Sequence, residues 1–60
     1  MNGLKKMREK MAITQGELAA MVDVDRSTIT KWETGASHPR VELLPKIASV
    51  LNCTVDDLLR

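Results

Sequence analysis

The chain has 60 residues, enough for one domain near the lower size limit for a core that holds together unaided. Hydrophobic residues make up 43% of the composition, but Trp32 is the only aromatic, so the core must be aliphatic, as suits a compact all-helical bundle. A formal net charge of +1 indicates no particular partner, one cysteine excludes an internal disulfide, and no apolar run approaches the roughly 18 residues of a membrane span.

Helical periodicity begins at the start of the chain. Apolar residues at helical spacing predict a first helix over about residues 3–11, with Asn2 as its cap: Leu4, Met7 and Met11. The following TQGE is a capping-box pattern, because Thr14 and Glu17 can each accept a hydrogen bond from the other's backbone N–H. It begins a second helix, whose inward stripe is Leu18, Ala19 and Val22.

A third helix is predicted over about residues 26–34. Asp25 can cap it, and Gly35 ends it where a left-handed residue costs least. The short joint from the second helix forces the two helices to cross steeply, with Ala19 allowing close approach and Val24 as an apolar plug. If Ile29 and Trp32 face inward, the polar side chains emerge together on the outer face: Arg26, Ser27, Thr28 and Lys31.

Two more helices complete the all-α pattern. The fourth carries an apolar stripe, and Pro45, tolerated only in a first turn, places its start near residues 41–42. Asn52 is a suitable left-handed stop, after which Thr54 and Asp57 begin a short fifth helix. No segment alternates with the period of a strand.

This arrangement resembles a known family, the helix-turn-helix of phage Cro and repressor proteins and the XRE-type transcriptional regulators. The matching text is TQGELA, then Val24 in the turn, then RSTITKWETG, LLPKIASVLN and TVDDLL, and it covers roughly Leu4 to Leu59. The resemblance implies that residues 1–60 form one compact five-helix lambda-repressor-like DNA-binding domain. Its helix-turn-helix would be the second and third helices.

The resemblance also implies roles for individual residues. Gln15 matches the first residue of the second helix, which reaches a phosphate or a base edge in the family. Arg26 could grip guanine O6 and N7, and Lys31 could reach a guanine or a phosphate. The full set of expected DNA-binding residues is Thr14, Gln15, Arg26, Ser27, Thr28, Lys31, Ser37, His38 and Arg40, the last three in a loop along the phosphate backbone.

Other positions that match the family have a structural role instead of a contact with DNA. Arg8 and Glu33 match residues that form a partly buried ion pair between the first and third helices, which would fix the angle of the reading helix. Asp23 stands where the family usually has glycine, because the turn needs a left-handed backbone. An aspartate there costs on the order of 1 kcal/mol.

The functional hypothesis is sequence-specific binding of double-stranded DNA by a transcriptional regulator, with repression favoured. One such domain buries little surface, so we expect a homodimer on a pseudo-palindromic operator, with a dimer surface at Val55, Leu58 and Leu59. The alternative is a protein-interaction module, such as an antitoxin or a fragment of a larger regulator, in which these polar residues are only solvated surface. No grouping expected of an enzyme, metal site, cofactor site or small-molecule site is present, and the lone cysteine favours a reducing, cytoplasmic location.

Overall fold

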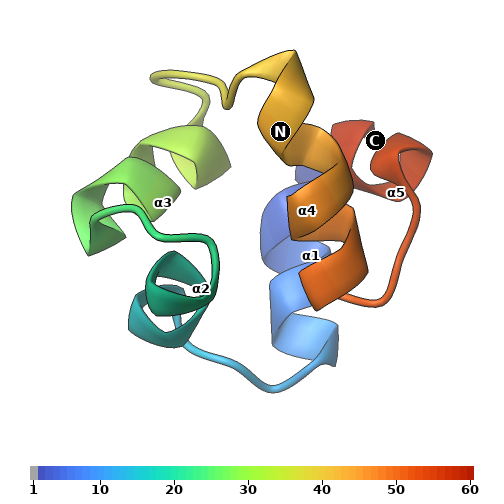
Figure 1. The fold of residues 1–60 in the computed structure, drawn as a ribbon, viewed down its shortest axis with the longest axis horizontal. Coiled ribbons are helices and arrows are strands. Elements are labelled where there is room, and N and C mark those ends of the chain that lie inside the picture. The colour runs from blue at the N-terminus through green and yellow to red at the C-terminus, as the bar shows by residue number, and fades with distance from the viewer. Residues whose placement is uncertain (1) are drawn as a thin grey trace.

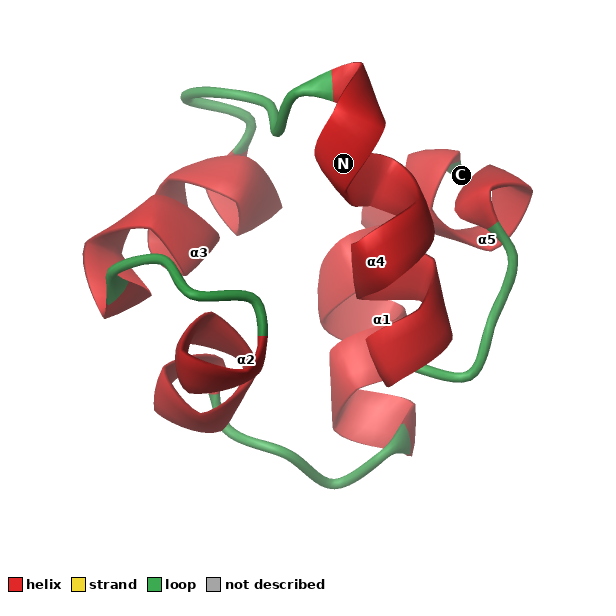
Figure 2. Ribbon diagram, viewed as in Figure 1, coloured by secondary structure: helices red, strands yellow, loops and turns green. Residues whose placement is uncertain are grey.

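Five α-helices and one 3-10 turn form the fold in the computed structural model, which describes residues 2–60 (Figures 1 and 2). The elements are α1 (Asn2–Lys10), α2 (Gln15–Met21), α3 (Arg26–Thr34), η1 (Val41–Leu43), α4 (Leu44–Val50) and α5 (Val55–Leu59). No strand occurs among the described residues, so the all-α, five-helix prediction is confirmed. None of these helices combines the length and the apolar character needed to cross a membrane.

Every helix contributes to one core. The fully buried large side chains come from all five helices or their ends: Leu4, Leu18, Ile29, Ile47, Leu51 and Leu58. Trp32 is 4% exposed and belongs to the same cluster, which confirms its predicted place in the core. Met11 does not follow the prediction. It is 43% exposed, because α1 ends at Lys10 and the chain then turns away.

Both predicted capping boxes form. The Glu17 backbone N donates to Thr14 Oγ1 at 3.0 Å and the Thr14 N donates to Glu17 Oε1 at 2.8 Å. Thr54 and Asp57 repeat the pattern at 3.1 and 3.0 Å, and these bonds hold the pKa of Asp57 below its ordinary value. Asp25 occupies the N-cap position of α3, but its side chain makes no capping hydrogen bond, so that part of the prediction is wrong. The Asn2 side chain lies outside the described side chains.

Left-handed backbone conformations mark the ends of the helices. Asp23, Gly35 and Asn52 have φ values of 60°, 84° and 53°, as predicted. Ala12 also has a positive φ, 58°, which the sequence pattern did not indicate. An alanine gains nothing from this region, whereas an Asn or Asp side chain can hydrogen-bond locally, so Ala12 is the most strained of these positions.

The fourth helix begins differently from the prediction. Its expected start lies near residues 41–42, but residues 41–43 form the 3-10 turn η1 and the α-helix starts at Leu44. Pro45 has no N–H, so an α-helix starting at Val41 would lack the bond to that residue's carbonyl. The tighter turn instead uses a bond from Leu43 N to the Arg40 carbonyl, 2.9 Å long.

The first and last helices touch through a glycine. Gly3 is buried, and a Cβ added there would lie 1.8 Å from the Asp57 carbonyl oxygen. Only a residue without a side chain permits the backbones of α1 and α5 to approach this closely. The helices lie on the side of the bundle opposite to α2 and α3 (Figure 1).

Candidate nucleic-acid interface

The joint between α2 and α3 sets the position of the candidate interface. Asp23 takes the left-handed conformation, and Val24 N donates to the Ala19 carbonyl at 2.9 Å, so the chain reverses within four residues. Val24 is half-buried against the core, as predicted for the plug of the joint. Because Ala19 and Ile29 are buried between the helices, the start of α3 projects outward, and Arg26 and Ser27 are exposed.

A buried charge network fixes α3 to the helices behind it. Arg8 Nε donates to Glu33 Oε2 at 2.7 Å and Nη2 to Oε1 at 3.3 Å, which confirms the predicted ion pair. Arg8 Nη1 also donates to the Ile13 carbonyl at 2.8 Å, so one guanidinium joins α1, the α1–α2 loop and α3. The Arg8 and Glu33 side chains are only 11% and 4% exposed, respectively.

The network keeps both partners charged. Burial alone would raise the pKa of Glu33, but the hydrogen bonds from Arg8 and Gln15 outweigh it, and the net pKa is lowered. The hydrogen bond to Glu33 raises the pKa of Arg8 in turn. A pair with this geometry is better evidence for a fixed helix orientation than for stability, because desolvation offsets much of the attraction.

Gln15 bridges α2 and α3. Its Nε2 donates to Glu33 Oε1 at 2.8 Å, and its Oε1 accepts from Thr30 Oγ1 at 3.2 Å. From the sequence, Gln15 is expected to contact DNA, whereas Thr30 is not singled out, because in isolation it resembles any exposed helical threonine. The available signal was the spacing of Arg26, Thr30 and Glu33 at i, i+4 and i+7, which places all three on one flank of α3.

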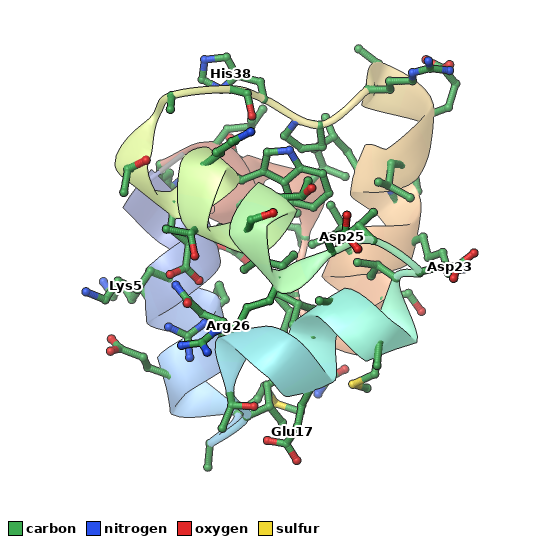
Figure 3. All side chains as sticks on the ribbon, turned by 90° about the vertical axis from the view of Figure 1, so that its left-hand side faces the viewer. Lys5, Glu17, Asp23, Asp25, Arg26 and His38 are labelled. Atoms are coloured by element: carbon green, nitrogen blue, oxygen red, sulfur yellow. The ribbon has the colours of Figure 1, made fainter. Side chains whose placement is uncertain are left out.

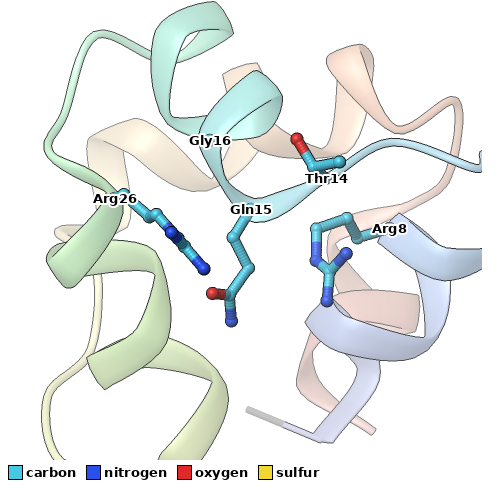
Figure 4. A pocket seen from close by; sticks show the side chains of 5 residues that line it. All are labelled: Arg8, Thr14, Gln15, Gly16 and Arg26. Carbon is cyan, nitrogen blue, oxygen red and sulfur yellow. The ribbon is translucent and has the colours of Figure 1, made fainter.

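A surface cleft of about 430 Å³ opens at the start of α2. Its lining residues are Arg8, Thr14, Gln15, Gly16 and Arg26. Figure 4 shows the Arg8 and Arg26 side chains on opposite sides of Gln15, both turned toward it. Glu33 offsets the charge of Arg8, whereas Arg26 has no ion-pair partner in the described part of the chain. The cleft therefore presents an unbalanced positive charge beside amide and hydroxyl groups.

The other predicted residues differ in their exposure. Ser27, Lys31, His38 and Arg40 are exposed, while Thr28 and Ser37 are half-buried. In Figure 3, Arg26 lies near α2, and His38 lies at the opposite end of α3 in the following loop. The same view shows Asp23 at one edge, Asp25 nearer the centre and Lys5 of α1 at the other edge.

The predicted dimer surface needs one correction. Leu58 is fully buried in the core and cannot contact a second chain in this fold. The capping box starts α5 at Val55, which turns Leu58 inward beneath α1, near Gly3. Leu59 is 58% exposed and Val55 is half-buried, so these two remain candidates.

The fold and the site together define a helix-turn-helix domain of the lambda-repressor-like type. The family model described as Helix-turn-helix matches residues 4–58, and the chain therefore belongs to this family of DNA-binding transcriptional regulators, which is not an enzyme class. The resemblance seen in the sequence is confirmed.

Similar proteins carry related names. The HTH-type transcriptional activator BcrR of Enterococcus faecalis is 38% identical over 56 residues, which cover 93% of this chain and 28% of that protein. An uncharacterized HTH-type transcriptional regulator of Archaeoglobus fulgidus is 42% identical over 55 residues, covering 92% and 78%. The putative HTH-type transcriptional regulatory protein MJ1164 of Methanocaldococcus jannaschii is 41% identical over 49 residues, covering 82% and 15%. The chain thus spans most of one relative but less than a third of the other two.

Proposed function

We propose that this chain binds a specific sequence of double-stranded DNA by inserting α3 into the major groove, and thereby regulates transcription. The observation that carries the proposal is the outward-facing start of α3, with exposed Arg26 and Ser27, fixed to α1 and α2 by the Arg8–Glu33–Gln15 network. A helix that reads base edges must keep a constant angle to the groove, and a buried network supplies that constraint.

The exposed side chains divide into two kinds of contact. The exposed Lys31 and Ser27 of α3 would contact base edges, and Arg26 has the forked donors that match guanine O6 and N7. Phosphates would be held at the cleft by Thr14 and Gln15. The half-buried Thr28 would touch base or backbone, and the loop residues Ser37, His38 and Arg40 would follow the backbone, with Lys5 at the edge.

We further propose a homodimer on a pseudo-palindrome, with half-sites about 34 Å apart. A single small domain buries limited surface on DNA, so doubling the contact supplies the affinity that selectivity requires. Leu59 and Val55 are the apolar side chains of α5 available for this contact. An operator overlapping a promoter would give repression. BcrR is named an activator, so the position of the operator would decide the direction. Regulating transcription requires access to the chromosome, so we propose that the protein acts in the cytoplasm.

Selection of bound duplexes from a random library, followed by affinity measurements at several salt concentrations, tests the proposal. The logarithm of the affinity should fall linearly with the logarithm of salt concentration, with a slope of about 0.9 for each phosphate neutralised. Lys31→Ala and Arg26→Ala should weaken binding by about 1–3 kcal/mol if they read bases.

Lys46→Ala removes one positive charge from an exposed position on α4 and serves as the matched control, with little expected loss of DNA affinity. Selected sequences should show two related half-sites one helical turn apart. Unchanged affinity in both α3 variants would refute the proposed reading surface. No selective binding at low salt would favour a protein-interaction module, such as an antitoxin.

A further inference from the structure

The hydroxyl group of Thr30 crosses from α3 to the first residue of α2. The single hydroxyl proton of Thr30 has two acceptors within reach, Gln15 Oε1 at 3.2 Å and the Arg26 carbonyl at 3.4 Å, and the contact with Gln15 is the shorter. The bond to Arg26 is the ordinary i−4 contact of a helical threonine. The bond to Gln15 is not local, because it joins residues of two different helices.

The two partners of Gln15 determine how its carboxamide is turned. The ionised Glu33 carboxylate only accepts hydrogen bonds, so the nitrogen end of the amide must face it. The oxygen end is then left for a donor, and Thr30 supplies one. With Glu33 occupying one N–H, the second N–H of Gln15 remains available for an acceptor outside the protein.

We propose that Thr30 is a positioning residue for Gln15, holding the carboxamide at its oxygen end so that the remaining N–H is presented to DNA in a fixed orientation. This inference rests on the DNA binding proposed above. Without the Thr30 bond, Gln15 is tethered only at its nitrogen end, and its amide must be ordered again each time DNA binds. Thr30 thereby contributes to affinity without itself reading a base.

The test compares three variants at two threonines of α3. Thr30→Val keeps the β-branched shape and removes the hydroxyl, whereas Thr30→Ser keeps the hydroxyl. Thr34→Val is the matched control, because Thr34 Oγ1 bonds only to the Lys31 carbonyl, at 3.2 Å, and reaches no other helix. Binding is measured on the duplex selected above, and the Gln15 side-chain amide is followed by ¹⁵N-resolved NMR of the free protein.

We expect Thr30→Val to weaken DNA binding about three- to tenfold, the effect of one hydrogen bond. Thr30→Ser and Thr34→Val should stay within about twofold, and all three variants should remain fully folded under the conditions of the binding measurement. In Thr30→Val, the two amide proton signals of Gln15 should shift and exchange faster with solvent. In a Gln15→Ala background, Thr30→Val should cause no further loss, because Thr30 acts through Gln15.

Two results would overturn the inference while leaving the proposed function intact. One is wild-type affinity in Thr30→Val together with unchanged Gln15 amide signals. The other is an equal loss with and without Gln15, which would mean that Thr30 contacts DNA directly. If the wild-type protein binds no duplex, the proposed function fails and the DNA role of Thr30 fails with it. The amide signals then still decide whether Thr30 orients Gln15.

Discussion

Replacing Arg8 with methionine should cost this protein more stability than replacing Arg8 and Glu33 together. The single substitution keeps most of the apolar stem of Arg8 and removes its three hydrogen bonds. Glu33, 4% exposed, then keeps only the bond from Gln15, and the Ile13 carbonyl loses its partner. Most of the loss in the free energy of unfolding comes from burying the Glu33 carboxylate without its counter-ion.

The expected loss is about 3–5 kcal/mol, the usual cost of removing one member of a buried pair. The total stability of a domain of 60 residues is of the same order, about 3–9 kcal/mol, so Arg8→Met should be largely unfolded in mild urea. The double variant Arg8→Met/Glu33→Leu contains no buried charge. Its remaining cost is the unpaired Ile13 carbonyl and Gln15 amide, about 1–3 kcal/mol.

Urea denaturation followed by tryptophan fluorescence measures these differences directly. Trp32 is the only tryptophan, is 4% exposed and lies on α3 next to Glu33 in sequence, so its emission reports the loss of this packing. The pair Asp56–Arg60 is the control: it has a 2.7 Å contact, but its side chains are 70% and 75% exposed. Arg60→Met should change stability by less than about 0.5 kcal/mol.

Losses in Arg8→Met and in the single variant Glu33→Leu that simply add in the double variant would contradict this expectation. Additive losses would mean that Arg8 and Glu33 contribute separately and that no buried charge is left uncompensated when one is removed. A loss below about 1 kcal/mol in Arg8→Met would also contradict it, because that is the size of an exposed ion pair.

Three further predictions concern stability. Gly3→Ala should cost about 3 kcal/mol or more, because its Cβ would lie 1.8 Å from the Asp57 carbonyl, whereas Gly16→Ala, whose Cβ would meet nothing closer than 3.9 Å, should be neutral or slightly stabilising by denaturation. Ala12→Gly should raise the free energy of unfolding by up to about 1 kcal/mol, since φ is 58°; an unchanged or lower urea midpoint would show that the strain is absent. The pKa of Glu33 is lower in the folded protein than its ordinary value of 4.5, so its ionisation stabilises the fold fully above pH 4.5 and this stabilisation is lost as the pH falls through the folded pKa. The stability advantage of the wild type over Glu33→Gln should therefore be constant near neutrality and shrink below pH 4.5. An advantage independent of pH would contradict the lowered pKa of Glu33.

Local sequence signals predicted most of the fold because they act within a few residues. The Thr14 and Thr54 capping boxes need only a partner three positions away, and both form. The left-handed Asn52 was likewise predicted from a single position, and that of Asp23 from the family resemblance, but Ala12 was not predicted, because alanine carries no preference for such a turn. The Arg8–Glu33 pair joins residues that are far apart in sequence, and it was predicted from the family resemblance alone.

Two local predictions failed, the Asp25 side-chain cap and the start of the fourth helix, and the other errors concern packing between distant helices. Val55, Leu58 and Leu59 read equally as core or surface, and only the orientation of the short α5 shows that Leu58 is buried. Gly3 looks like a poor helix former until the Asp57 backbone is placed beside it. In the site, Thr14, Gln15 and Arg26 line one cleft, but the role of Thr30 depends on the distance between its hydroxyl and Gln15, which the sequence does not show.

The contact between Gly3 and Asp57 bears on how the chain folds during synthesis. Helices α2 and α3 are neighbours in sequence and can pair as soon as both have left the ribosome. The packing of α1 is completed only by α5. A nascent chain that still holds residues 55–59 in the exit tunnel can therefore have α2 and α3 paired while the packing of α1 is incomplete. Competence to bind a ligand should therefore arise only after α5 has left the ribosome.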